Sequence, residues 1–173
     1  MKVENYLSVE FPSRSANEAL ARSLVACFAA QLDPTMDELG DIKTAVSEAV
    51  TNCIVHAYPD RIGTITLRCR ILEGRTLDIV IRDKGRGIPD IEQARTPMFT
   101  TGGEERSGMG FTIMESFMTS LRVTSKVGKG TTVHMKRKIV RRGDASLVRR
   151  RSSARHRRAT GLRQSSSSWK IRA

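Results

Sequence analysis

Three short stretches decide how this chain is expected to fold: Ser47-Glu48-Ala49-Val50-Thr51-Asn52, Asp83-Lys84-Gly85-Arg86-Gly87 and Ser107-Gly108-Met109-Gly110-Phe111. Glu48 and Asn52 are four residues apart, so a helix places both on one face. The two glycines after Asp83 allow the backbone to come close to a flat ligand. The glycine-rich turn before Phe111 opens an apolar helix and offers free N–H groups to a phosphate. Each stretch alone is a weak signal, but together and in this order they predict a nucleotide-binding site.

Hydrophobic periodicity predicts the elements on either side of these stretches. We expect strands at residues 6–11, 63–72, 76–82, 121–127 and 131–140, and helices at residues 16–32, 36–55 and 111–118, with a short helical turn near residues 91–94. Because strands that neighbour in sequence usually pair, this order favours an α/β protein of the α+β two-layer sandwich type. Its sheet is expected to be mixed and mostly antiparallel, with the helices on one face.

Two local patterns refine the helices. Thr35 followed by Glu38 has the spacing of a capping box, which places a helix start at residue 36. The first helix is expected to bury a row of apolar residues spaced by four, namely Leu20, Leu24, Phe28 and Leu32.

The strong positive charge belongs to the end of the chain. Residues 141–173 contain 11 Lys and Arg against one acidic residue, which accounts for +10 of the net charge of +12. We therefore expect a folded domain at residues 1–142 and a basic, Ser- and Arg-rich disordered tail at residues 143–173. The folded domain is nearly neutral, so no direct binding of nucleic acid is expected from it.

The remaining composition gives the expected setting of the protein. The three cysteines, Cys27, Cys53 and Cys69, are widely spaced and odd in number, which favours buried reduced thiols over disulfides or a zinc site. The N-terminus lacks an apolar signal core, and no apolar run reaches membrane-spanning length. A cytoplasmic protein with no membrane partner is expected.

Each candidate residue also has a simpler interpretation. Glu48 alone is compatible with an exposed helical residue, and Asp-x-Gly sequences such as that at Asp83 are common in surface turns. His56, one turn after Asn52, is more typical of a structural hydrogen-bonding residue. If Asp83 contacts a base, its carboxylate favours adenine, whose exocyclic amine is a donor, over guanine, whose O6 is an acceptor.

The stretches from Glu48 to Asn52, from Asp83 to Gly87 and from Gly108 to Gly110 resemble the N, G1 and G2 boxes of the GHKL ATPase superfamily. This superfamily includes gyrase, Hsp90, histidine kinases and MutL, which share the Bergerat ATP-binding fold. Over about residues 5–140 the chain more closely resembles the sporulation anti-sigma-F factors, a family of dimeric serine-protein kinases. The matching segments are Leu32-Asp33-Pro34-Thr35-Met36-Asp37-Glu38-Leu39, Ser47 to Asn52, Phe99-Thr100-Thr101 and Arg106-Ser107-Gly108-Met109-Gly110-Phe111-Thr112-Ile113-Met114-Glu115.

The resemblance implies a role for each matching residue. Glu48 would be the general base, Asn52 would hold Mg²⁺ and Asp83 would contact adenine. Residues 96–106 would form the ATP lid, in which Gly102-Gly103 replaces the Lys-Pro step that is usual in the family. Arg22 would contact the protein partners. The remaining ATP or ADP contacts would come from Gly85, Gly87, Thr100, Thr101, Arg106, Ser107, Gly108, Met109, Gly110, Phe111 and Thr131.

The function implied is that of an anti-sigma factor and kinase. Such a protein sequesters a sporulation sigma factor and, with ATP and Mg²⁺, phosphorylates a serine of its anti-anti-sigma antagonist; a homodimer is also implied. Two alternatives stay open at this point. One is a related switch kinase for a general-stress sigma factor, and the other is a binding-only anti-sigma module.

Overall fold

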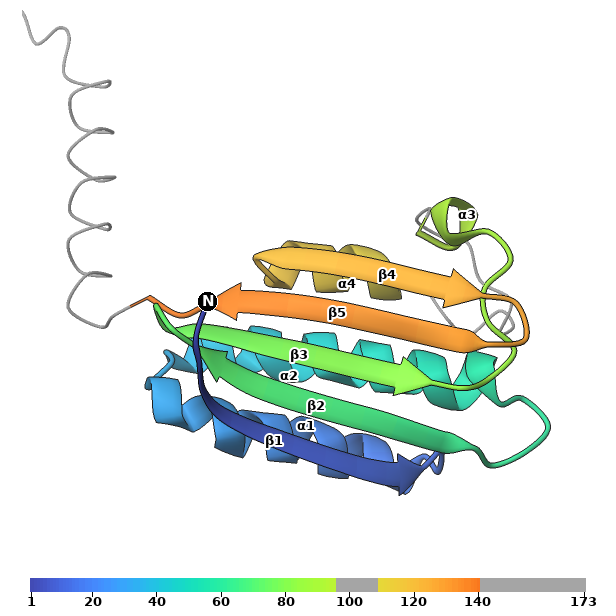
Figure 1. Cartoon of the computed structure of the whole chain (residues 1–173), viewed down its shortest axis with the longest axis horizontal. Coiled ribbons are helices and arrows are strands. Elements are labelled where there is room, and N and C mark those ends of the chain that lie inside the picture. Colours follow the sequence, from blue (N-terminus) through green and yellow to red (C-terminus); the bar gives the residue numbers. More distant parts are fainter. Residues whose placement is uncertain (96–108, 141–173) are drawn as a thin grey trace, which may run out of the picture. The chain divides into compact units, whose positions relative to one another are not determined.

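The structure, a computed structural model, describes residues 1–95 and 109–140. Its elements follow the order that the sequence pattern predicts (Figure 1). They are β1 (Val3–Pro12), α1 (Ala16–Ala29), the 3₁₀ turn η1 (Ala30–Leu32), α2 (Met36–Asn52), the π-helical turn η2 (Cys53–Ala57), β2 (Thr64–Leu72), β3 (Thr76–Asp83), α3 (Ile91–Arg95), α4 (Gly110–Phe117), β4 (Ser120–Lys126) and β5 (Gly130–Lys138).

The five described strands form one sheet in the order β1-β2-β3-β5-β4. Helices α1, α2 and α4 cover one face of this sheet (Figure 1), so the predicted α+β two-layer fold class is confirmed. All four pairs of neighbouring strands are antiparallel, so the parallel pairing that a mixed sheet would include is not found among the described strands. Hairpin connections explain two of these pairs, since short turns can only join antiparallel strands.

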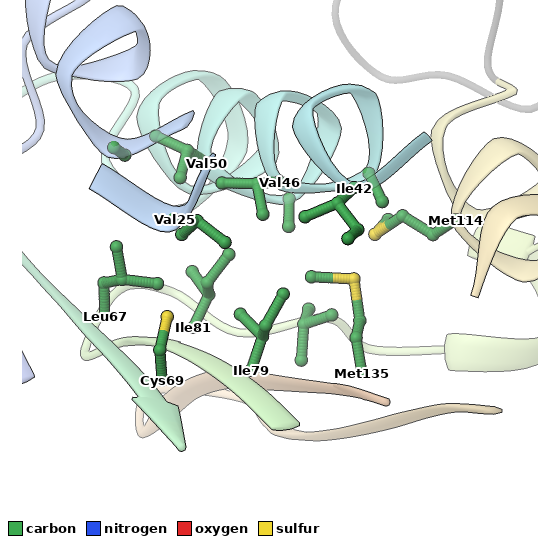
Figure 2. Packing of buried hydrophobic residues seen from close by; sticks show 14 of the residues in the cluster. Val25, Ile42, Val46, Val50, Leu67, Cys69, Ile79, Ile81, Met114 and Met135 are labelled. Carbon is green, nitrogen blue, oxygen red and sulfur yellow. The ribbon is translucent and has the colours of Figure 1, made fainter. Parts of the chain in front are cut away.

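The core lies between α2 and the middle of the sheet. Ile42, Val46 and Val50 point from α2 toward the strands, where Ile79 and Ile81 meet them from β3 (Figure 2). These five side chains are fully buried. Burial of each stabilises the fold by roughly 1.5–3 kcal/mol relative to exposure, so α2 is held firmly against the sheet.

The buried face of α1 differs from the expected row. The structure buries Ala21, Val25 and Phe28, whereas Leu20 is 48% exposed. A row spaced by four residues drifts around a helix that has about 3.6 residues per turn, so Leu20 and Leu32 cannot share a face. The expectation that Leu20 is a core residue was wrong.

Helix α2 starts as predicted and ends earlier than predicted. Thr35 Oγ1 accepts a hydrogen bond from the Glu38 N–H at 3.2 Å, and Glu38 Oε2 accepts one from the Thr35 N–H at 2.9 Å. At the other end the α-helix stops at Asn52, and residues Cys53–Ala57 form a π-helical turn where an α-helix was expected up to residue 55. The wider turn leaves both Cys53 and Ala57 buried.

The face of the sheet away from the helices carries a buried carboxylate. Asp78 of β3 has a fully buried side chain, and it accepts hydrogen bonds from Arg70 Nε at 2.8 Å and from His134 Nε2. Burial alone would raise the pKa of Asp78, but the hydrogen bonds from His134 and Arg70 outweigh it, and the pKa is lowered. The carboxylate of Asp78 is therefore ionised, and its hydrogen bonds link β3 to both neighbouring strands, β2 and β5.

Residues Met1–Ile139 form one compact unit. The predicted tail at residues 143–173 lies outside the described residues. All three cysteines are free; Cys53 and Cys69 are buried as expected, whereas Cys27 is exposed, contrary to expectation. In the described part of the chain, every helix is too short or too polar to cross a membrane.

Candidate functional site

The polar residues at the end of α2 face the start of α4. Glu48 and Asn52 are half-buried, and Ala49 and Val50 between them are fully buried. A Cβ atom placed on Gly110 would lie 3.0 Å from Glu48 Oε2 and 3.5 Å from Asn52 Nδ2. Two stretches that are about sixty residues apart in the sequence therefore meet in space. Because Gly110 has no side chain, the start of α4 can approach the carboxylate and the amide this closely.

Helix α4 is fixed to the core by its apolar side. The side chains of Phe111 and Met114 are buried, and Met109, the residue before the helix, is 39% exposed. Phe111 was predicted to contact a nucleotide; because its side chain packs in the core, only its backbone remains for such a contact. The first N–H groups of a helix have no partner inside the helix, so the start of α4 presents donors beside Glu48 and Asn52.

Asp83, the last residue of β3, is buried and not part of a surface turn, since only 3% of it is exposed. Its Oδ1 accepts hydrogen bonds from the backbone N–H groups of Gly85 at 2.8 Å and of Thr131 at 3.2 Å. Burial raises the pKa of Asp83, and these N–H groups offset only part of the shift. A buried carboxylate held by backbone donors is a strong candidate for ligand recognition.

The two glycines after Asp83 bring backbone segments together. A Cβ on Gly85 would lie 2.3 Å from the carbonyl oxygen of Ala57, and one on Gly87 would lie 2.3 Å from that of Lys126. Gly87 also has a φ of +76°, which other residues rarely adopt. In the described residues these glycines therefore serve the packing of the turn, in addition to the close approach of a ligand that the sequence pattern predicts.

Two residues near Asp83 were missed by the sequence analysis. The Tyr58 hydroxyl accepts a hydrogen bond from the Lys84 N–H at 2.7 Å and donates one to the Thr64 carbonyl at 2.8 Å, which holds the turn after Asp83 in place. The Cys53 thiol contacts Asp83 Oδ2 at 3.6 Å. Burial, followed by the nearby charge of Asp83, raises the pKa of this thiol. Neither residue belongs to a recognisable motif, so no sequence signal pointed to them.

The described candidate residues thus form two groups. Glu48 and Asn52 meet Gly110, while Asp83 meets Gly85 and Thr131. The two groups are joined through the chain, because Cys53 follows Asn52 directly and contacts Asp83. Five predicted contacts lie outside the described residues, as does the predicted lid at residues 96–106; these contacts are Thr100, Thr101, Arg106, Ser107 and Gly108.

Two further candidates lie apart from these groups. Arg22 is an exposed residue of α1, and its Nε lies 3.7 Å from Glu18 Oε1 of the same helix. His56 is half-buried within the π-helical turn η2, so it does not continue the regular α-helical spacing of Glu48 and Asn52.

The fold and this arrangement define a class of protein. Residues 11–137 match the histidine kinase-like ATPase domain family. Among solved structures, the chain is similar to one containing the RsbU and RsbW domains of Rv1364c from Mycobacterium tuberculosis, with a TM-score of 0.59 and 16% identity over 79% of this chain and 33% of that chain. It is also similar to the histidine kinase domain of a blue-light activated histidine kinase from Erythrobacter litoralis, with a TM-score of 0.50 and 24% identity over 70% and 61% of the two chains.

Curated relatives narrow the class. The chain is 55% identical to the anti-sigma F factor of Caldanaerobacter subterraneus subsp. tengcongensis over 142 residues, which cover 82% of this chain and 99% of the relative. It is 54% identical to the anti-sigma F factor of Geobacillus kaustophilus over 140 residues, or 80% of this chain and 96% of the relative. The chain belongs to the anti-sigma F factor family of histidine kinase-like ATPases.

Proposed function

We propose that this chain is an anti-sigma factor that sequesters a sporulation sigma factor and is also an ATP-dependent protein serine kinase. The observation that carries the proposal is the 55% identity to an anti-sigma F factor, because it extends over 99% of that relative. The ATPase domain matched over residues 11–137 supports the nucleotide-dependent part of the activity. The kinase substrate in this proposal is an anti-anti-sigma protein, which is inactivated when one of its serines is phosphorylated.

The base of ATP or ADP would be recognised by Asp83. Its carboxylate accepts hydrogen bonds, so it selects a purine with an amino group at position 6. Thr131 donates its N–H to the same carboxylate and would lie near the base. The conversion of Asp83 to asparagine should weaken ATP binding by one to a few kcal/mol, since a buried charge-assisted hydrogen bond is lost.

The phosphates would lie between α2 and the start of α4. An amide oxygen such as that of Asn52 is the kind of hard ligand that Mg²⁺ uses together with phosphate and water, and Gly110 at the start of α4 lies close to this amide. Bound Mg²⁺ would neutralise charge on the phosphates. The N–H groups at the start of α4 would face the same oxygens.

Glu48 would act as the general base of phosphoryl transfer. Its carboxylate would take the proton of the substrate serine as the serine oxygen forms its bond to the γ-phosphorus and ADP leaves. A well-placed base typically contributes about 10²–10⁴-fold to the rate. The position of Glu48 beside Asn52 and Gly110 supports this role, because base and metal ligand are then on adjoining turns of one helix.

The partners of the proposed activity are proteins. They are an RNA polymerase sigma factor, the anti-anti-sigma substrate and a second copy of this chain in a homodimer. Arg22 is exposed on α1, away from the core, and would be available to both protein partners. Replacement of Arg22 by alanine should weaken binding of these partners and leave ATP binding unchanged, as measured by calorimetry with each ligand.

The decisive experiment is incubation with labelled ATP, Mg²⁺ and a candidate anti-anti-sigma protein. Wild-type protein should transfer the label to serine. Glu48→Gln should abolish transfer and bind ATP with nearly unchanged affinity, whereas the control Glu115→Gln, on the exposed side of α4, should retain transfer. Loss of transfer and ATP binding together in Glu48→Gln would assign Glu48 a structural role. Sigma-factor binding without any transfer by wild type would indicate a binding-only module.

A further inference from the structure

The two oxygens of the Asp83 carboxylate have different surroundings. Oδ1 accepts hydrogen bonds from two backbone N–H groups, those of Gly85 at 2.8 Å and Thr131 at 3.2 Å. Oδ2 contacts the Sγ atom of Cys53 at 3.6 Å. Oδ1 therefore already accepts two hydrogen bonds from the protein backbone. Oδ2 contacts a weaker donor and is the oxygen better able to accept a further bond from a ligand.

The contact between Cys53 and Asp83 joins two parts of the candidate site. Cys53 is the first residue of η2, directly after Asn52, and Asp83 is the last residue of β3. Only 4% of Cys53 and 3% of Asp83 are exposed, so water does not compete freely for the contact. An ionised carboxylate has only acceptors, and the thiol is therefore the donor of the pair.

We propose that Cys53 is a positioning residue for base selection, whose thiol holds the Asp83 carboxylate so that Oδ2 faces the exocyclic amine of adenine. This inference rests on the proposed ATP binding. The backbone donors fix Oδ1, and a second contact at Oδ2 limits rotation of the carboxylate about its Cβ–Cγ bond. A fixed acceptor favours a 6-amino purine and disfavours a 6-oxo purine, whose oxygen would face the carboxylate.

A purely structural role makes a different prediction. A free buried cysteine commonly behaves as a small apolar core residue. If Cys53 only fills space, its replacement loosens the site for every nucleotide alike. If it positions Asp83, its replacement changes the ratio of affinities for two nucleotides that differ at position 6. The ratio of the Kd of ITP to that of ATP, where ITP carries a 6-oxo purine, therefore distinguishes the two roles.

The test compares Cys53→Ala with Cys53→Ser in the full chain, with ATP and ITP affinities measured by calorimetry. Alanine and serine are similar in size, but only serine has a donor. Cys53→Ala should reduce the preference for ATP over ITP by about 2–5-fold, the effect of losing one weak hydrogen bond. Cys53→Ser should restore the preference. The control is Cys69→Ala, a buried cysteine of β2, which should leave the ratio unchanged.

Two results would overturn the inference. One is an equal loss of ATP and ITP affinity in Cys53→Ala, and the other is a serine variant with the same ratio as alanine. If Cys53→Ala does not fold, Cys53→Val, which also lacks a donor, takes its place in the comparison with Cys53→Ser, and the same two results would overturn the inference. Failure of the proposed ATP site itself looks different: wild type would then bind neither nucleotide, or both equally.

Discussion

The replacement of Gly110 by alanine should separate the stability of the fold from the proposed chemistry. Gly110 is the first residue of α4, and its φ is not in the positive range that disfavours other residues. Alanine has a lower entropic cost than glycine in a helix, so the free energy of unfolding should stay the same or rise by up to about 1 kcal/mol. A loss of activity in this variant cannot then be attributed to unfolding.

The added methyl group would act directly on the candidate site. It would lie 3.0 Å from Glu48 Oε2 and 3.5 Å from Asn52 Nδ2, so the carboxylate has to move by a few tenths of an ångström. A misplacement of 1 Å costs about 10²-fold in rate, and the smaller shift should therefore cost about tenfold, or about 1.4 kcal/mol in the barrier. The methyl group also occupies the space proposed for phosphate and Mg²⁺, which should add to the loss.

The assay is phosphoryl transfer from labelled ATP, measured together with urea unfolding. The matched control is Gly40→Ala on α2, because a Cβ there has no neighbour within 4 Å. Gly40→Ala should gain similar stability and keep full activity. The reasoning would be refuted by a Gly110→Ala variant that transfers phosphate at the wild-type rate, or by a Gly40→Ala variant that loses as much activity as Gly110→Ala.

Three further predictions concern the fold that supports the site. Asp78→Asn should lower the free energy of unfolding at neutral pH by about 1–3 kcal/mol, a range that allows for partner side chains that are 32% exposed. Because folding lowers the pKa of Asp78, the wild type should lose this stability as the pH falls below the ordinary value of 3.8. In urea unfolding at low pH, the free energy of unfolding of the variant should therefore change less with pH than that of the wild type. Gly87→Ala should lower the free energy of unfolding by at least about 2 kcal/mol, because Gly87 has a φ of +76° and an added Cβ would clash with the Lys126 carbonyl oxygen. The control Gly74→Ala should lower it less, because Gly74 has a φ of +80° but no neighbour within 4 Å. Arg137→Met should lower the Tm, because the Arg137 guanidinium donates hydrogen bonds to the Phe117 carbonyl at the end of α4 and, at 3.0 Å, to Asp41 Oδ2 of α2. If the Tm falls no further than in Asp41→Asn, the contact with α4 has no stabilising role.

Much of the fold was predictable because the local patterns agree with one another. Apolar alternation predicts β1, turn residues predict the two hairpins that hold the other four described strands, and the Thr35–Glu38 pair predicts the start of α2. The meeting of Glu48 with Gly110 was predictable from motif order alone. Each of these features depends on residues close in sequence, or on a motif that carries its own spacing.

The features that were not predicted depend on long-range packing. The π-helical turn at Cys53–Ala57 has no local signal, because it reflects how that segment packs against the end of β3 and the turn after it. The contact of Cys53 with Asp83 spans thirty residues of sequence. Gly85 looked like a ligand-facing glycine, yet its nearest neighbour is the Ala57 backbone, which only the folded chain reveals.

In the proposed site, the end of α2, the turn after Asp83 and the start of α4 together bind Mg²⁺ and adenosine triphosphate. Calorimetric titration of the folded chain with ATP, in the presence of Mg²⁺, tests this most directly. We expect saturable binding that is weakened by one to a few kcal/mol, or about fivefold or more, in Asp83→Asn and is stronger for ATP than for ITP. An absence of binding at millimolar ATP, or binding that is unchanged in Asp83→Asn, would contradict the claim.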